Sequence, residues 1–255
     1  VGGIGVGCPG TVHDRPGGVL YSNNLAWADF AMGDYLQAAT GMPVRLANDA
    51  NAAALGEALA GCAKGTDSAV FLTLGTGVGG GVVLGGRLLT GYTGAASEPG
   101  HMVICDTPDA PLCTCGRRGD LEAYASATAL IRMTREAMQA HPECGLWKLA
   151  DLDTVEGRTV FDARDAGDPV AREVVEAYIH WLAVGIANLI NIFYPEVVGL
   201  SGGVANQGEA LLAPLRAQVE PMVFGAAYAD KKTRLVSCTL GYRAGVIGAA
   251  LLAAQ

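Results

Sequence analysis

An Asn-Asp pair, Asn48-Asp49, stands where a short apolar stretch, residues 44–47, gives way to an alanine-rich run. A carboxylate at the end of a strand in an α/β sheet projects into the crevice where ligands bind, and it can act there as a general base. The same residue types are also favourable helix N-caps, which is a structural role. The pair on its own leaves both interpretations open.

A glycine-rich segment, residues 75–81, follows the apolar stretch 69–74. Its first, third and sixth residues have the spacing of a dinucleotide-binding turn, but that motif opens a helix, whereas residues 82–89 predict a β-hairpin with a Gly-Gly turn. No Gly-Lys-Ser/Thr follows, so the segment is not a P-loop. We expect either a phosphate cradle of free N–H groups at Gly75-Thr76-Gly77 or a tight structural turn.

Polar side chains reappear in the loop-rich stretch 91–122. Glu98 and His101 lie three residues apart, and a carboxylate and an imidazole can both accept hydrogen bonds from sugar hydroxyls. A solvated loop would explain the same two residues. Cys113 and Cys115 are separated by one residue, which suits a tetrahedral Zn²⁺ site that His101 could complete. A pair of free thiols is the alternative.

Elements that alternate along the chain must position these groups. Strands and helices that alternate in this way are typical of an α/β fold. Strands are predicted at residues 3–8, 44–47, 69–74 and 197–200, and helices at residues 28–40, 52–61, 121–140, 168–193, 207–219 and 243–254.

The composition narrows the functional classes. The 255 residues carry a formal net charge of −8, which disfavours nucleic acid as a partner because phosphate binding needs clustered Lys and Arg. No uninterrupted apolar run reaches the roughly 18 residues of a membrane helix, and the chain shows no basic leader. The odd number of cysteines, seven, favours a reducing compartment over a disulfide framework. We therefore expect a cytoplasmic protein without a membrane span.

Four segments in this order, taken together, resemble the ROK family of sugar kinases and repressors: residues 48–57, 74–81, 98–101 and 113–122. The resemblance covers essentially the whole chain. It implies an α/β fold of the actin-like ATPase (ribonuclease H-like) type, with two domains and a cleft between them. The expected small domain comprises residues 1–52 together with 243–255, and the large domain comprises residues 53–242 with the zinc loop.

The resemblance also implies an activity, which is ATP-dependent phosphorylation of a hexose at its 6-hydroxyl, with glucose as the first expectation. Asp49 matches the general base. The sugar-contacting positions are Gly10, Asn24, Asn48, Asp49, Glu98, His101 and Glu122. The nucleotide positions are Gly75, Thr76, Gly77, Gly202 and Gly203. ATP with Mg²⁺, a structural Zn²⁺ and a homodimer are implied as well.

Two departures from the family pattern stand out. The Asp-x-Gly-Gly-Thr phosphate loop with which the family opens is absent from these residues, so we expect the chain as written to be a weak or inactive kinase. The zinc loop carries Asp120 where the family has a third cysteine. The expected ligands are thus His101, Cys113, Cys115 and Asp120, with Cys105 as the alternative fourth.

Other functions stay open at this point. A sugar-responsive ROK repressor would share these motifs and carry a DNA-binding module outside this chain. A sugar-binding protein without catalytic activity is a further alternative. The motifs do not separate glucose from N-acetylmannosamine, N-acetylglucosamine, fructose or allose, because selectivity depends on the shape of the pocket.

Overall fold

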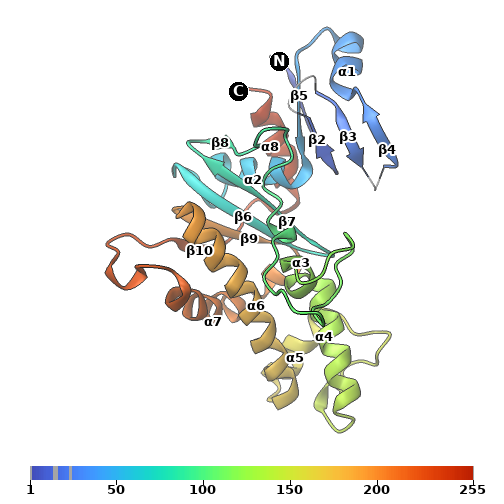
Figure 1. Ribbon diagram of the computed structural model, residues 1–255, viewed down its shortest axis with the longest axis vertical. Helices are drawn as coiled ribbons and strands as arrows, with labels where there is room; N and C mark the ends of the chain where they lie inside the picture. The colour runs from blue at the N-terminus through green and yellow to red at the C-terminus, as the bar shows by residue number, and fades with distance from the viewer. Residues whose placement is uncertain (1, 14–16, 23–24, 255) are drawn as a thin grey trace.

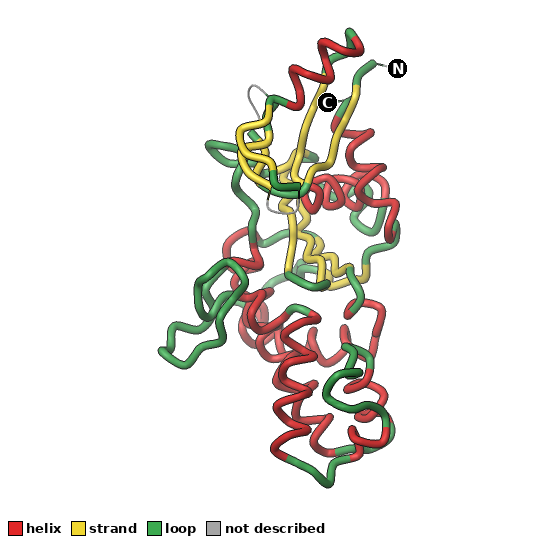
Figure 2. Tube along the Cα trace, turned by 90° about the vertical axis from the view of Figure 1, so that its right-hand side faces the viewer, coloured by secondary structure: helices red, strands yellow, loops and turns green. Residues whose placement is uncertain are grey.

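The computed structural model describes residues 2–13, 17–22 and 25–254. The strands lie in one half of the molecule together with some of the helices, and the other half consists of helices and loops (Figure 2). The central element is a five-stranded sheet of order β10-β9-β6-β7-β8. Its strands are β6 (Ser68–Leu74), β7 (Val78–Leu84), β8 (Arg87–Leu88), β9 (Val197–Ser201) and β10 (Arg234–Ser237).

Both faces of this sheet are covered. Strand β6 runs parallel to β9 and antiparallel to β7. Its residues Val70 and Leu72 belong to the main core that α6 (Pro169–Phe193) helps to build, whereas Ala69 and Phe71 pack against α2 (Asp49–Ala60). Strands buried on both sides are continuously apolar, which explains why the composition of residues 69–74 predicted β6 correctly.

A second layer lies beyond α2 (Figure 1). Strand β1 (Ile4–Cys8) pairs in parallel with β5 (Val44–Asn48), and the C-terminal helix α8 (Ala244–Leu252) packs on β1 and on α2. A three-stranded antiparallel sheet and helix α1 extend this layer. Their bounds are β2 (Thr11–Val12), β3 (Val19–Ser22), β4 (Trp27–Phe30) and α1 (Met32–Thr40).

The helical half contains α3 (Leu121–Ala125), α4 (Ala127–Ala140), α5 (Thr159–Asp165) and α7 (Glu209–Val219) around α6. Short 3₁₀ turns connect the elements throughout the described residues. They are η1 (Pro99–His101), η2 (Gly145–Lys148), η3 (Val204–Gln207), η4 (Glu220–Met222), η5 (Ala226–Tyr228) and η6 (Gly241–Arg243).

The structure corrects several predicted elements. The helix predicted at 121–140 is two helices, because Ser126 has an extended backbone and its hydroxyl accepts the Ala129 N–H as the N-cap of α4. The helix predicted at 28–40 begins only at Met32, since residues 27–30 form β4. Four further elements were not predicted because each is too short to give a clear periodic pattern in the sequence. They are β2, β3, β10 and α5.

Helix α6 is long and apolar enough to span a membrane by length and composition. Asn188 and Asn191 interrupt its apolar residues, so it contains no unbroken apolar run of that length. In this protein much of the helix lies in the core, with 56% of its most apolar window buried and Tyr178, Leu182 and Ile186 fully so, while Ile192 near its end is exposed. The buried Tyr178 hydroxyl donates to the Ala125 carbonyl oxygen at 2.7 Å, which satisfies its polar group inside the core.

Helices α2 and α8 approach so closely that their glycines have no room for a side chain. A Cβ on Gly248 would overlap the Ala52 carbonyl, and a Cβ on Gly56 would overlap the Ala244 carbonyl. On the same helix α8, Gly245 has open space around the corresponding position. The contact therefore depends on Gly248 and not on Gly245.

This difference predicts opposite stability changes. Gly248→Ala should lower the free energy of unfolding by about 1–3 kcal/mol, because overpacking forces the helices apart. Gly245→Ala should raise it by about 0.5–1 kcal/mol, because alanine loses less backbone entropy in a helix. Denaturant unfolding followed by circular dichroism measures both. Equal changes for the two variants would contradict the close packing of α2 and α8.

Candidate active site

A cavity of about 1040 Å³ opens between the start of α2, the turn that joins β6 to β7, and the loop that leads to α3. It gathers most of the residues singled out in the sequence, although these are spread over more than a hundred positions. The predicted residues that line it are Gly10, Asp49, Gly75, Thr76, Gly77, Glu98, His101, Cys115 and Glu122.

Asp49 is the first residue of α2, and its side chain is exposed to this cavity. Its Oδ1 accepts the Ala50 N–H at 2.9 Å, an interaction with the free N–H groups at the start of the helix. The opposite carboxylate oxygen has no hydrogen-bond partner within the described residues. Asp49 is therefore oriented by its helix and still free to act on a bound molecule.

The neighbouring Asn48 has a different position. Its Oδ1 accepts the N–H groups of Ala50 and Asn51 as the N-cap of α2, and its Nδ2 donates to the Gly10 carbonyl at 3.0 Å. It is not among the residues that line the cavity. Asn48 is thus the N-cap of α2, and Asp49 is the carboxylate that faces the cavity. The structural and the functional interpretation of this pair therefore each apply to one of the two residues.

The β6–β7 turn is fixed from two sides. The Gly75 N–H donates to the Gly77 carbonyl at 3.0 Å, which closes the turn. At the start of α4, the Ala127 N–H donates to the Gly75 carbonyl at 2.8 Å, and the Thr128 hydroxyl donates to the Thr76 carbonyl at 2.8 Å. β7 begins at Val78, and a strand rather than a helix follows the turn, which removes the dinucleotide interpretation.

Glu122 connects this turn to the cysteine loop. Its Oε2 accepts the Val78 N–H at 2.9 Å, and its Oε1 accepts the Thr114 hydroxyl at 3.0 Å and the Cys113 thiol at 3.3 Å. A side chain on Gly77 would overlap this carboxylate. Glu122 thus holds two walls of the cavity in one arrangement.

Glu98 faces the cavity just before η1. Partial burial raises the pKa of its carboxyl, and the carboxylates of Asp49 and Glu122 raise it further, whereas His101 lowers it. Carboxylates that influence one another in this way surround a common space. Together they give the cavity an acidic, hydrogen-bond-accepting wall, which suits a neutral polyhydroxyl ligand.

A group of metal-ligand types lies at the edge of the cavity. One donor atom from each of His101, Cys113, Cys115 and Asp120 lies within 4.8 Å of all the others. The His101 Nδ1 is 3.3 Å from Asp120 Oδ2 and 3.9 Å from Cys113 Sγ, and Cys115 Sγ is 3.4 Å from Asp120 Oδ2. These separations fit the edges of a tetrahedron around Zn²⁺, which are about 3.3–3.8 Å for its usual bond lengths.

Asp120 can take the place of a third cysteine because its two carboxylate oxygens have different partners. Oδ1 accepts the Ala123 N–H at 3.0 Å as the N-cap of α3, and Oδ2 faces His101 and Cys115. Cys105 lies outside this donor group, with its thiol 3.5 Å from the Thr107 hydroxyl. The geometry therefore selects Asp120 over Cys105 as the fourth donor.

A smaller cavity of about 440 Å³ adjoins the first and shares Ala50, Ala53 and Thr73 with it. Gly202 lines this cavity with a φ of 88°, and a Cβ there would overlap the backbone of Leu74. Gly203 follows but does not line it. The Thr73 and Ser201 hydroxyls lie 2.9 Å apart where the two cavities meet.

Asn24 lies outside the described residues. Tyr21 and Thr114 line the larger cavity although the sequence analysis did not select them. Thr114 stands between the two cysteines, a position that could have identified it, whereas Tyr21 lies on β3, whose short pattern gave no signal.

The family model described as the ROK family matches residues 1–255. The chain belongs to the ROK family. It is 39% identical over 256 residues to a glucokinase of Halalkalibacterium halodurans, and this match covers 99% of this chain and 76% of that protein. It is 31% identical over 246 residues to the xylose repressor of Caldicellulosiruptor bescii, which covers 96% of this chain and 61% of that protein.

Among solved ROK structures, this chain is similar to a glucokinase from Streptomyces griseus in complex with glucose and AMPPNP. The TM-score is 0.84 at 37% identity, and the match covers 100% of this chain and 82% of the other. The α/β fold is therefore the actin-like ATPase fold that the ROK resemblance implied. The repressor has the lower identity of the two curated relatives, which favours the kinase branch of the family.

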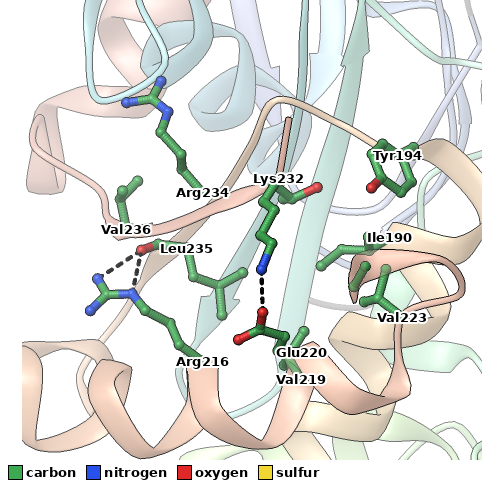
Figure 3. A pocket seen from close by; sticks show the side chains of 12 residues that line it. Ile190, Tyr194, Arg216, Val219, Glu220, Val223, Lys232, Arg234, Leu235 and Val236 are labelled. Atoms are coloured by element: carbon green, nitrogen blue, oxygen red, sulfur yellow. Dashed lines mark hydrogen bonds and ion pairs between the residues drawn. The ribbon is translucent and has the colours of Figure 1, made fainter. Parts of the chain in front are cut away.

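A third cavity, of about 460 Å³, lies between the C-terminal parts of α6 and α7 and strand β10 (Figure 3). Its wall is mainly apolar, with Ile190, Val219 and Leu235, and Lys232 forms an ion pair with Glu220 across it. It contains none of the predicted site residues that the structure describes. The ROK motifs therefore point to the larger cavity and not to this one.

Proposed function

We propose that this protein, as its gene encodes it, is an ATP-dependent hexokinase that phosphorylates glucose at the 6-hydroxyl. The observation that carries the proposal is the single cavity in which Asp49 faces Glu98, His101 and Glu122 and shares the space with the turn at Gly75–Gly77. The 39% identity to a glucokinase over nearly the whole chain supports the same reaction.

Asp49 is the proposed general base. As the 6-hydroxyl oxygen attacks the γ-phosphorus of ATP, the bond from that phosphorus to the bridging oxygen of ADP breaks, and the hydroxyl proton passes to the Asp49 carboxylate. Phosphoryl transfer has a loose transition state, so the position of the hydroxyl matters as much as its deprotonation. Contact with the Ala50 N–H holds the carboxylate at the start of α2 for this purpose.

The sugar ring is assigned to the acceptor-rich wall. Glu98 and Glu122 would accept hydrogen bonds from ring hydroxyls, and His101 would use Nε2 because its Nδ1 faces the metal-ligand group. Gly10 would approach the sugar through its backbone, and Asn48 would act indirectly by holding Gly10. Asn24 is retained as a proposed sugar contact on the resemblance alone.

The nucleotide is assigned to the two adjoining cavities. The N–H groups of Thr76 and Gly77, in the turn that Gly75 closes, would hold phosphate oxygens, and Gly202 would lie against the adenosine. Gly203 is retained as a proposed adenosine contact on the resemblance alone. Mg²⁺, which accompanies ATP, would neutralise the charge that develops on the phosphates. Shared walls at Ala50, Ala53 and Thr73 allow one nucleotide to reach from one cavity into the other.

His101, Cys113, Cys115 and Asp120 would hold a structural Zn²⁺, because their separations and donor types fit it. Zinc would supply a rigid cross-link between η1 and the cysteine loop and would take no part in the transfer. Through the Thr114 hydroxyl, which lies between the two cysteines, the same loop holds Glu122. The metal would thereby position a sugar contact from outside the reacting atoms.

Residues 1–52 with 243–255 are the proposed small domain, and residues 53–242 are the proposed large one. Helix α2 runs unbroken from Asp49 to Ala60 across this boundary, so it would connect the two. All seven cysteines are free thiols, which supports a reducing, cytoplasmic location.

A homodimer is the proposed assembly. Ile192 and Phe224 are both exposed, and Asn191 joins the two segments that carry them through bonds to the backbone of Met222 and Phe224. Exposed apolar residues on these two segments would face a second copy. Sedimentation analysis tests this assembly, with Phe224→Ser as the variant expected to release monomers. A wild-type protein that sediments as a monomer would rule out the dimer.

The experiment for the function is a coupled assay of glucose phosphorylation with the protein as its gene encodes it. We expect turnover that requires ATP and Mg²⁺ and yields glucose 6-phosphate. N-acetylmannosamine, N-acetylglucosamine, fructose and allose serve as competing substrates, and the highest kcat/KM identifies the preferred sugar. Sugar-dependent release of DNA without phosphorylation of any of these sugars would favour the repressor branch instead.

A further inference from the structure

A second group of soft donor atoms lies apart from the cysteine loop. Glu57, Cys62 and Cys238 each offer one donor atom, and these atoms all lie within 4.8 Å of one another. Glu57 belongs to the last turns of α2, Cys62 follows that helix, and Cys238 directly follows β10. Segments distant in the sequence therefore bring two thiols and a carboxylate to one place.

The Glu57 carboxylate is buried, with 2% exposure, and its position is fixed by main-chain donors. Its Oε2 accepts the N–H groups of Cys62 and Thr239 at 3.0 and 3.1 Å, and the Thr239 hydroxyl at 3.4 Å. Among the described residues, its Oε1 accepts the Leu240 N–H alone, at 2.7 Å. A carboxylate oxygen has two lone pairs, so this oxygen has capacity for a second partner.

The two thiols are accessible as well as close together. Both are half-buried, and Cys238 lines the 440 Å³ cavity that contains Gly202, which gives an ion a path from solvent. A metal cation binds the thiolate form of cysteine, so a bound cation would displace the thiol protons.

We propose that Glu57, Cys62 and Cys238 form a second metal site, selective for a soft divalent cation such as Zn²⁺ or Cd²⁺. Two thiolates and one carboxylate are donors that these ions accept, whereas Mg²⁺ requires oxygen ligands. Binding replaces two S–H bonds with two metal–sulfur bonds and releases two protons to solvent. Affinity at this site should therefore rise with pH.

Occupancy would join the end of α2 to the segment that follows β10. Asp49 begins α2, and Gly241, shortly after Cys238, lines the same cavity as Gly202. The cation would therefore tie together two elements that border the candidate nucleotide cavity. This inference does not depend on the proposed phosphorylation, because metal uptake can be measured without activity.

The test is a cadmium titration of reduced protein from which a chelator has removed all metal. Equilibrium dialysis and the ultraviolet charge-transfer band of cadmium thiolates are the readouts. We expect the wild type to bind one Cd²⁺ per chain more than the double variant Cys62→Ala/Cys238→Ala. Loss of either thiol alone should weaken that binding by more than about 100-fold.

Cys144→Ala is the matched control, because Cys144 is buried in the main core outside both donor groups. Alkylation of the wild type, read by peptide mass spectrometry, needs no variant, and Cd²⁺ should protect Cys62 and Cys238 together. Equal cadmium uptake by wild type and double variant would overturn the proposal. So would unprotected thiols, or a Cys62–Cys238 disulfide in protein kept under reductant.

Discussion

Replacing Asp49 with Asn is expected to lower kcat for glucose phosphorylation by about 10²- to 10⁴-fold, the usual contribution of a general base. Asparagine has nearly the same shape, and its Oδ1 can still accept the Ala50 N–H that orients Asp49. It cannot accept the proton of the sugar hydroxyl. The loss should therefore appear in kcat, while glucose still stabilises the variant against thermal unfolding.

The control for this prediction is Asp34→Asn, because Asp34 is an exposed carboxylate in the first turn of α1 and lies outside the cavity. Its kcat should match the wild type. An Asp49→Asn variant that retains most of its turnover would show that another group accepts the proton. A variant that no longer binds glucose would instead give Asp49 a role in binding and not in proton transfer.

The second large effect is expected in the cysteine loop. Cys115→Ser should remove the bound zinc and weaken glucose binding by about 10–100-fold, the range found when a group that supports a metal site is lost. The reason is that the loop fixes Glu122 through the Thr114 hydroxyl, and His101 through the shared donor group. Elemental analysis gives zinc per chain, and titration gives glucose affinity.

Cys105→Ser is the matched control for the zinc loop, since Cys105 lies in the same stretch but outside the donor group. It should keep both the metal and the affinity for glucose. Equal loss of zinc in the two variants would contradict the assignment of Asp120 as the fourth ligand. A Cys115→Ser protein without zinc but with unchanged glucose affinity would separate the metal from the sugar site.

The central sheet and the long helices could be predicted from the sequence because their patterns are strong. Strand β6 is continuously apolar, since both of its faces are buried, and α6 shows a helical pattern over 25 residues. The turn at residues 75–77 was recognised because glycines followed by a second strand match no helix-opening motif. These features depend on local chemistry alone.

Other features depend on contacts between distant residues. Ser126 divides α3 from α4 through a single cap, and a capping serine within a helical pattern gives no distinct signal. The hydrogen bond by which Asn48 holds Gly10 joins residues that are far apart in the sequence, so it could not be predicted from the pattern around Asn48. Likewise, the sequence positions of Cys62 and Cys238 do not reveal that they meet at Glu57.

The most direct measurement is a crystal structure of the protein with glucose and a non-hydrolysable ATP analogue. We predict that the sugar occupies the cavity of about 1040 Å³, with its 6-hydroxyl on the Asp49 carboxylate and its ring hydroxyls on Glu98, His101 and Glu122. The γ-phosphate should lie at Gly75–Gly77. Glucose bound elsewhere, or with its 6-hydroxyl turned away from Asp49, would contradict the proposed reaction.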